Sequence, residues 1–278
     1  MALVSLTRLD LSKGMRVFWL LLAILPASAS DPLSQTSVRG AELESAHRWQ
    51  EAADLYRSAL EQANRRDSRF WLLTSLAEVE FDRRSYAQSE RWLNQAAKTI
   101  EGLPVTAPEH ARLLNALGTL HLVQGNLIAA ELELSHAVEL GKSTAPPEDR
   151  AAALHNLAAV EMHRNRLAEA AAHETQALAI WRERFGERHG YVMKAWISLS
   201  SVEGLRGNWQ AAAQSLERAL SISPSDEALW NYAIVLDKLN RHEAKAIRQR
   251  RHTPVVTPLP LVDVNALSRR DALAVTSR

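Results

Sequence analysis

Ten histidines are the residues of this 278-residue sequence that most readily suggest metal chemistry. Three of them, His155, His163 and His173, follow one another at intervals of 8 and 10 residues. Those intervals do not match the i, i+4 pairing that places two imidazoles on one helical face with a carboxylate between them. We therefore expect no metal site and no cofactor.

Other residue types that carry chemistry also lack partners at useful spacing. The serines of Ser198–Ser201 lie in a helical pattern without a nucleophile elbow or a His/Asp partner. Glu131 and Glu133 diverge on a helix, so they cannot act as a paired acid and base. Gly204 and Gly207 follow no strand, which a phosphate-binding loop requires. The absence of cysteine excludes disulfides, a thiol nucleophile and a lipid-bearing cysteine. We expect a protein that is not an enzyme.

The elements that would position any binding side chain recur along the chain. In one copy, residues 117–137, an apolar helix breaks at Gly125-Asn126 and a second helix follows. The first large residue after each such break lies 37, 41, 40 and 42 residues from the previous one, and these anchors are Trp49, Tyr86, Leu127, Leu167 and Trp209. Each copy is predicted to be a helical hairpin.

Small side chains stand at fixed distances after the anchors. Three residues after them come Ala52, Ser89, Ala130, Ala170 and Ala212, and ten residues after them come Ala59, Ala96, Ala137, Ala177 and Ala219. Two antiparallel helices approach closely only where one of them presents no bulk, so a small residue is expected to face a large one. A leucine at Gly118 or Ala130 should cost about 1–3 kcal/mol by overpacking.

This pattern resembles the tetratricopeptide repeat family, with its W-x2-L-G-x2-Y…A-x3-F…P signature. The fifth copy follows it in order, with Trp196, Leu199, Ser200, Trp209, Ala212, Leu216, Ala219 and Pro224. The spacing of about 40 residues is similar to the longer repeats of kinesin light chain. Glu174 departs from the pattern, which wants an aromatic residue or leucine there, and Thr36 and Arg39 weaken the first copy. The resemblance implies an all-α fold, a right-handed superhelical solenoid of about five to six helical hairpins.

The resemblance also implies a binding surface, because the first helix of each repeat lines the concave groove in this family. The groove-facing residues that it assigns are Thr74, Glu78, Phe81, Arg112, Asn115, Thr119, His155, Asn156, Met162, Lys194 and Ser198. Asn, Lys and Arg there can bond a peptide backbone or a terminal carboxylate. Asn156 and Lys194 match two of the five positions of the carboxylate clamp of chaperone-binding members. Asn115, Thr119 and Ser198 stand at the others, so a complete clamp is not expected.

The N-terminal residues 1–29 have the pattern of a secretory signal peptide. Lys13 and Arg16 precede the nine apolar residues 17–25, and Ala27-Ser28-Ala29 forms a small-x-small cleavage signature. Nine residues are fewer than the roughly 20 that a membrane span needs. We expect an exported protein, periplasmic or extracellular, and the true start at Met1 or at Met15 stays open. Residues 1–29 hold three basic residues and one acidic residue, so the rest has a formal net charge of −1 instead of +1, which favours neither nucleic acid nor anionic lipid.

Proline, glycine and asparagine mark the predicted boundaries. We expect a signal peptide at 1–29, a linker at 30–35, the solenoid at 36–251 and a flexible C-terminal tail at 252–278. Within the solenoid the predicted repeats are about 33–66, 67–103, 108–143, 148–186 and 190–223, with a degenerate cap at 225–251. Four helices are predicted to end in the left-handed conformation, one in each of the hairpins three to six, at Gly125, Asn165, Gly207 and Asn240. Ser225 is predicted to be the N-cap of the first helix of the last hairpin.

Together these features favour an exported scaffold that holds a peptide or partner protein in its groove without catalysis. Two alternatives stay open. The first is a structural envelope protein that self-associates through its ends or tail, and the second, which the near-neutral charge opposes, is an RNA-binding helical-repeat protein. The identity of the partner is left to a few surface side chains, which the repeat pattern does not specify.

Overall fold

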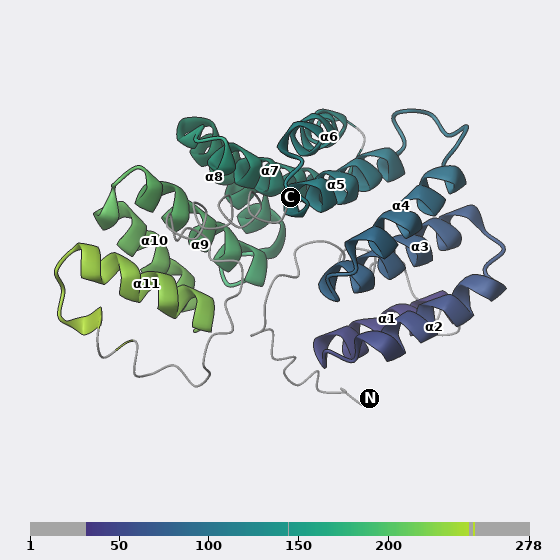
Figure 1. The fold of residues 1–278 in the computed structure, drawn as a ribbon, viewed down its shortest axis with the longest axis horizontal. Helices are drawn as coiled ribbons and strands as arrows, with labels where there is room; N and C mark the ends of the chain where they lie inside the picture. The colour runs from purple at the N-terminus through teal and green to yellow at the C-terminus, as the bar shows by residue number, and fades with distance from the viewer. Residues whose placement is uncertain (1–31, 144, 245–246, 248–278) are drawn as a thin grey trace, which may run out of the picture. The chain divides into compact units, whose positions relative to one another are not determined.

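The computed structural model of the chain describes residues 32–143, 145–244 and 247, and the assigned elements in these residues are all α-helices. Figure 1 shows them in chain order: α1 (Pro32–Ser45), α2 (Trp49–Gln62), α3 (Arg66–Asp82), α4 (Tyr86–Thr99), α5 (Pro108–Val123), α6 (Leu127–Leu140), α7 (Pro147–His163), α8 (Leu167–Phe185), α9 (Gly190–Leu205), α10 (Trp209–Ile222) and α11 (Asp226–Lys238). The all-α prediction is confirmed.

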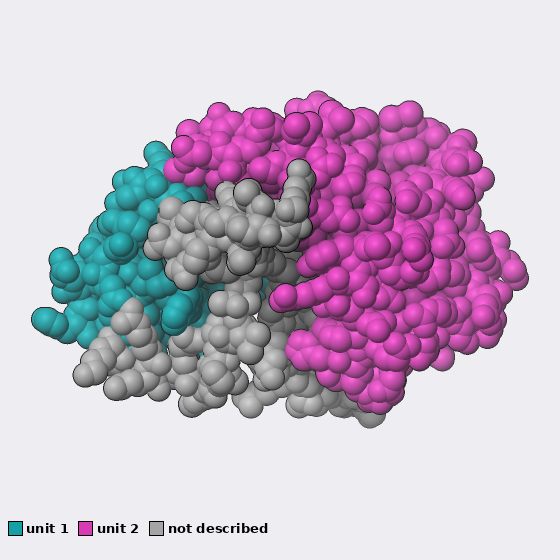
Figure 2. All heavy atoms as spheres, viewed as in Figure 1, with its two compact units in different colours: residues 1–15, 185–278 teal, residues 16–184 magenta. Residues whose placement is uncertain are grey.

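The chain divides into two compact units, coloured magenta and teal in Figure 2. Unit 2 comprises residues 16–184 and holds the first four hairpins, α1–α2 to α7–α8. Unit 1 comprises residues 1–15 and 185–278, and its described part, 185–244 and 247, holds the fifth hairpin and α11. The predicted signal peptide, the tail and most of the cap's second helix lie outside the described residues.

Helices that follow one another in the chain pack together throughout each unit. Contacts join α1 to α2, α3 to α4 and α5 to α6 as hairpins, and α2 to α3, α4 to α5 and α6 to α7 between hairpins. The first helices also touch one another, since α5 contacts both α3 and α7. In unit 1, α10 packs against α9 and α11. This order of contacts is the one predicted for stacked helical hairpins.

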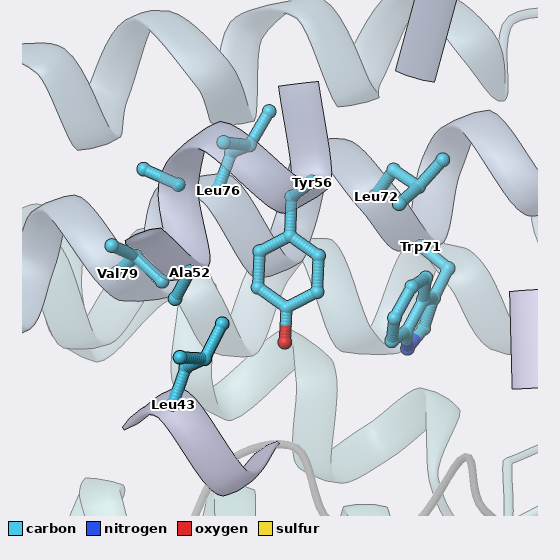
Figure 3. Close-up of a cluster of buried hydrophobic side chains, with 8 residues drawn as sticks. Leu43, Ala52, Tyr56, Trp71, Leu72, Leu76 and Val79 are labelled. Carbon is cyan, nitrogen blue, oxygen red and sulfur yellow. The ribbon is translucent and has the colours of Figure 1, made fainter. Parts of the chain in front are cut away.

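The core of the first two hairpins shows how large and small residues fit. Tyr56 lies among the apolar side chains of α1, α2 and α3 in Figure 3, and its ring meets Trp71 edge-on at a centroid distance of 5.6 Å. Its hydroxyl donates to Glu44 Oε1 at 2.6 Å. A Cβ added to Gly40 would lie 2.0 Å from the Tyr56 hydroxyl, so only glycine fits opposite this ring.

The predicted small positions are filled as expected. Ala52, Ala130, Ala170 and Ala212 are fully buried and Ser89 is 2% exposed. A Cβ on Gly118 would lie 2.6 Å from Leu134 Cγ, which supports the predicted need for a residue without bulk at this crossing of α5 and α6.

The turns inside the hairpins share one backbone conformation. Gly125, Gly207, Asn165 and Asn240 have φ of 80°, 79°, 58° and 55°, which confirms the predicted left-handed helix ends. The same place in the first two hairpins, two residues before each anchor, is held by His47 and Arg84 with φ of 56° and 62°. Arginine does not favour this conformation and histidine is less typical of it than glycine, so the sequence pattern did not predict these two turns.

Most predicted helix starts agree with the structure to within two residues. Pro108 and Pro147 open α5 and α7, and the Ser225 hydroxyl accepts the Ala228 N–H at 3.1 Å as the predicted cap of α11. The first helix differs, because α1 begins at Pro32 inside the predicted linker 30–35. A proline at the first helical position lacks only an N–H that the helix would leave unpaired, so it opens a helix as readily as it breaks one.

Candidate functional site

The candidate site lies on the first helices of the third and fourth hairpins, where α5 meets α7. Arg112 Nε on α5 donates to Asp149 Oδ2 on α7 at 2.7 Å. Further along the two helices, Asn156 Nδ2 on α7 donates to Asn115 Oδ1 on α5 at 3.0 Å. We call these four residues the α5–α7 polar face. The two bonds span two repeats, since the partners are 37 and 41 residues apart.

Local sequence explains how the polar face is positioned. Pro147 begins α7, so Asp149 stands in its first turn, where a carboxylate is favoured by the positive end of the helix. Arg112 stands in the second turn of α5, one repeat earlier. Asn115 and Asn156 lie in the middle of their helices, so the bond between them joins α5 and α7 at mid-length.

The ion pair of the polar face is partly shielded from solvent. The Arg112 side chain is 19% exposed to solvent and the Asp149 side chain is 14% exposed. Burial raises the pKa of the Asp149 carboxyl above its ordinary value, although Arg112 acts in the opposite direction, and the neighbouring Glu148 adds to the rise. Asp149 is thus an incompletely compensated carboxylate, and its charge depends on Arg112.

The amide pair has unused hydrogen-bonding capacity. Each asparagine amide offers two donor hydrogens and an oxygen with two lone pairs, and the bond between Asn156 and Asn115 uses one donor and one lone pair. Asn115 is 6% exposed and Asn156 is 8% exposed. Donor and acceptor groups thus stand side by side, which is the complement of the C=O and N–H groups of an extended peptide.

Two predicted groove residues are committed to their own helices. The Thr74 hydroxyl is fully buried and donates to the carbonyls of Phe70 and Trp71 at 3.0 and 2.8 Å. The Thr119 hydroxyl donates to the Asn115 carbonyl at 2.8 Å. Thr74 is therefore enclosed in the helix packing with its hydroxyl bonded to its own helix, and its assignment to the groove stays a prediction.

His155, another residue that the resemblance assigns to the groove, is partly buried and pairs with the second helix of its own hairpin. Its Nδ1 is 2.9 and 3.0 Å from the two carboxylate oxygens of Glu174 on α8, and its ring lies 5.5 Å from that of Trp181. Glu174 is fully buried. This pairing also explains why a carboxylate stands where the repeat pattern wants leucine: His155 supplies its partner.

Two further predicted residues, Phe81 and Met162, lie mainly in the helix packing. Phe81 lies 5.6 Å from the Tyr86 ring and packs on the core of the second and third hairpins. Met162 is 8% exposed. Glu78 is half-buried on α3. Of the nine sequence-predicted residues in unit 2, the structure joins Asn115 to Asn156 in a cross-repeat hydrogen bond, and Arg112 makes its cross-repeat contact with Asp149, which was not predicted.

Comparison with known proteins identifies the repeat. A family model described as tetratricopeptide repeat matches residues 149–225. Those residues are tetratricopeptide repeats. The match covers α7 to α10 almost completely, and thus both helices of the hairpin that carries Asn156. A search of curated proteins gave no match for the chain.

Solved structures of tetratricopeptide repeat proteins share the fold. BtubC (BKLC) from P. vanneervenii aligns over 84% of this chain and 99% of its own with a TM-score of 0.59 and 16% identity. The nearly identical TPR-like repeats of a putative kinesin light chain from Podosopora anserina align over 68% of this chain and 94% of their own with a TM-score of 0.51 and 20% identity. A Rap protein complexed with Competence and Sporulation Factor aligns over 74% of this chain and 58% of its own, with a TM-score of 0.64 and 18% identity. The predicted likeness to kinesin light chain-type repeats is confirmed for the fold.

The tetratricopeptide repeats of unit 1 contain the last two predicted residues. Ser198 on α9 is 1% exposed, and Lys194, one turn earlier, is half-buried with its Nζ shielded from solvent. Lys194 stands 15 residues before the anchor Trp209, as Arg112 does before Leu127. The basic side chain on the first helix is therefore a feature of the same repeat position in both units.

Asp149 is the site residue that the sequence prediction missed. A signal was available, because Arg112 and Asp149 are separated by about one repeat and both lie near the starts of first helices. Residues at such spacing face each other wherever successive first helices touch.

A metal centre in the described ranges would need several His, Cys, Asp or Glu side chains that converge on one point. Within those ranges no cluster of three or more His, Cys, Asp or Glu residues is arranged to hold a metal ion. The His155 and His173 side chains that suggested one are each paired with a different glutamate.

Over the described part of the chain, the helices are too short or too polar to cross a lipid bilayer.

Proposed function

We propose that this chain is an exported, non-catalytic scaffold that binds an extended segment of a partner protein along its first helices, with the α5–α7 polar face at the centre of the contact. The observation that carries the proposal is the cross-repeat bond between Asn156 and Asn115 beside the Arg112–Asp149 ion pair. It holds an amide donor and an amide acceptor in fixed positions, so little side-chain entropy remains to be lost on binding.

The likeness to solved structures is consistent with this role. Tetratricopeptide repeats present helix surfaces to protein partners, and one similar structure, the Rap protein, is a complex with Competence and Sporulation Factor. The shared property is the stacked-hairpin fold, and the contact residues must come from this chain itself. For export, the support is the basic, apolar and small-residue pattern of residues 1–29.

A random-heptapeptide phage library tests the binding function without a known partner. Peptides selected on the intact chain would be made synthetically with a fluorophore, and their Kd measured by anisotropy. Asn156→Ala together with Asn115→Ala should weaken binding by about 5- to 150-fold, since each of the two neutral hydrogen bonds is worth about 0.5–1.5 kcal/mol. Gln124→Ala, at an exposed position after α5, is the matched control and should leave Kd unchanged. Equal Kd values for the double variant and the control would refute the assignment of this face.

Self-association is a second candidate that one observation favours. Ile128 and Leu132 stand one turn apart on α6 and are 77% and 72% exposed. The same two repeat positions carry polar or small residues, or arginine, in the other hairpins: Gln50 and Asp54, Ala87 and Arg91, Ala168 and Ala172, and Gln210 and Gln214. A second copy of the chain could cover these two side chains by pairing α6 with α6. Sedimentation velocity of the wild type and of the double variant Ile128→Glu/Leu132→Glu tests this candidate. A dimer that forms through this face should be seen in the wild type and should dissociate in the variant.

A further inference from the structure

His189 caps the start of α9 with its side chain. Its Nδ1 accepts the backbone N–H of Tyr191 at 3.2 Å. The imidazole ring is stacked on Phe185 at the end of α8, with 4.5 Å between centroids and 23° between planes, and lies 4.8 Å from the Tyr191 ring. An aromatic cluster of three residues thus holds the capping ring in place.

The first helices of the hairpins differ in how their first turns begin. Helices α5 and α7 begin with Pro108 and Pro147, whose own nitrogens carry no hydrogen, so each of these first turns has one donor fewer to satisfy. Neither helix has a side-chain cap, and α3, which starts with Arg66, has none either. Helix α9 begins with Gly190 instead. Its first turn therefore keeps all its backbone donors, and the imidazole of His189 accepts one of them.

A capping imidazole differs from a capping serine because it titrates. An Nδ1 that accepts a hydrogen bond must be unprotonated, so the cap requires the neutral ring. Protonation would turn Nδ1 into a donor facing another donor and would place a positive charge at the positive end of the helix. The protonated ring must leave the cap.

The described neighbours of the ring are two aromatic side chains and several charged side chains. Phe185 faces it from α8 and Tyr191 from α9, and neither is ionised near neutral pH. Glu187 and Arg188 flank it in the connector with exposed side chains of opposite charge, and Arg184 on α8 is paired with Glu148.

We propose that His189 is an acid-sensitive cap: its neutral form closes the first turn of α9, and its protonation opens that turn. Burial lowers the pKa of His189 below its ordinary value of 6.5, in agreement with this geometry. Because the folded state binds the proton less readily than the unfolded state, the cap's contribution is complete above pH 6.5 and is lost as the pH falls through the lower pKa of the folded state. The turn that opens is the one that precedes Lys194.

Hydrogen exchange of the intact chain, measured by mass spectrometry, tests whether His189 is an acid-sensitive cap. After correction for intrinsic rates, peptides covering 190–194 should exchange about fivefold faster or more at pH 5 than at pH 7.5, the size expected for loss of a helix cap. His189→Asn keeps a capping oxygen that does not titrate, so its exchange in this peptide should not respond to pH. His189→Ala should exchange fast at both pH values, and the matched control His136→Ala, at an exposed position on α6, should behave as the wild type does.

Two results would overturn the proposal. One is a pH response of the 190–194 peptide in His189→Asn equal to that of the wild type. The other is an NMR titration of the His189 ring with a midpoint at or above that of an unstructured histidine peptide. Both are independent of ligand binding, so they leave the proposed function untouched.

Discussion

Glu161 on α7 and His173 on α8 contact each other at 2.9 and 3.0 Å through the carboxylate and Nδ1. The positions 40 residues earlier, in the third hairpin, carry the same pair in reverse. His121 is on α5 and Glu133 is on α6, and His121 Nδ1 lies 2.7 Å from Glu133 Oε2. Both pairs join the two helices of one hairpin. The two hairpins therefore use the same polar contact with its imidazole and carboxylate exchanged between helices.

The exchange predicts which substitutions the fourth hairpin tolerates. His173→Glu would set two carboxylates against each other beside the buried Glu161 and should lower the free energy of unfolding by about 1–3 kcal/mol. Adding Glu161→His restores the pair in the orientation of the third hairpin and should return the protein to within about 1 kcal/mol of the wild type. Urea unfolding of both single variants and the double variant gives the coupling energy. Additive losses would show that the pair is not interchangeable.

Alanine substitutions of two helical glycines, Gly118 and Gly204, should change the stability of the protein in opposite directions. Gly118→Ala would place a Cβ 2.6 Å from Leu134 Cγ, so it should destabilise by about 1–3 kcal/mol although alanine favours helix. Gly204→Ala in α9 is the control, because its Cβ would meet Trp209 at 3.4 Å, an ordinary contact. The control should be neutral or stabilise by about 0.5–1 kcal/mol. Thermal unfolding measures both, and a Gly118→Ala protein as stable as its control would contradict the packing described.

The Arg112–Asp149 pair predicts an asymmetric effect of its two partners. Arg112→Ala leaves a shielded carboxylate without its cation and should cost about 1–3 kcal/mol at pH 7. Asp149→Asn removes the charge that burial disfavours and should cost less than about 1 kcal/mol. Since the folded-state pKa of Asp149 is raised, its ionisation opposes folding. The wild type should therefore gain stability relative to Asp149→Asn as the pH falls toward 3.8, the ordinary pKa. Equal losses for both variants at pH 7 would contradict this account.

The sequence predicted the hairpins well because their packing depends on residue size at regular positions. Alanine or serine after each anchor can be read directly, and the structure buries all five of the residues three positions after it. The turn conformations at Asn165 and Gly125 were predictable for the same kind of reason, since few residue types favour positive φ.

The site was harder to predict because a helical position does not define a side chain's partner. Thr74 and His155 occupy first-helix positions like Arg112 does, but Thr74 bonds to its own helix and His155 turns toward Glu174. Which of several neighbours a polar side chain pairs with depends on contacts between repeats that the pattern does not encode. Glu174 departs from the repeat pattern, and a carboxylate that is fully buried needs a hydrogen-bonding partner, which a histidine can supply.

The central claim is that a peptide binds across α5 and α7 of unit 2. Its most direct test is a hydrogen-exchange footprint of the intact chain with and without a saturating selected heptapeptide. The account predicts slower exchange in peptides covering residues 112–119 and 149–156, and no change on the second helix α6. Protection confined to α6 or to another second helix, with α5 and α7 unchanged, would contradict it.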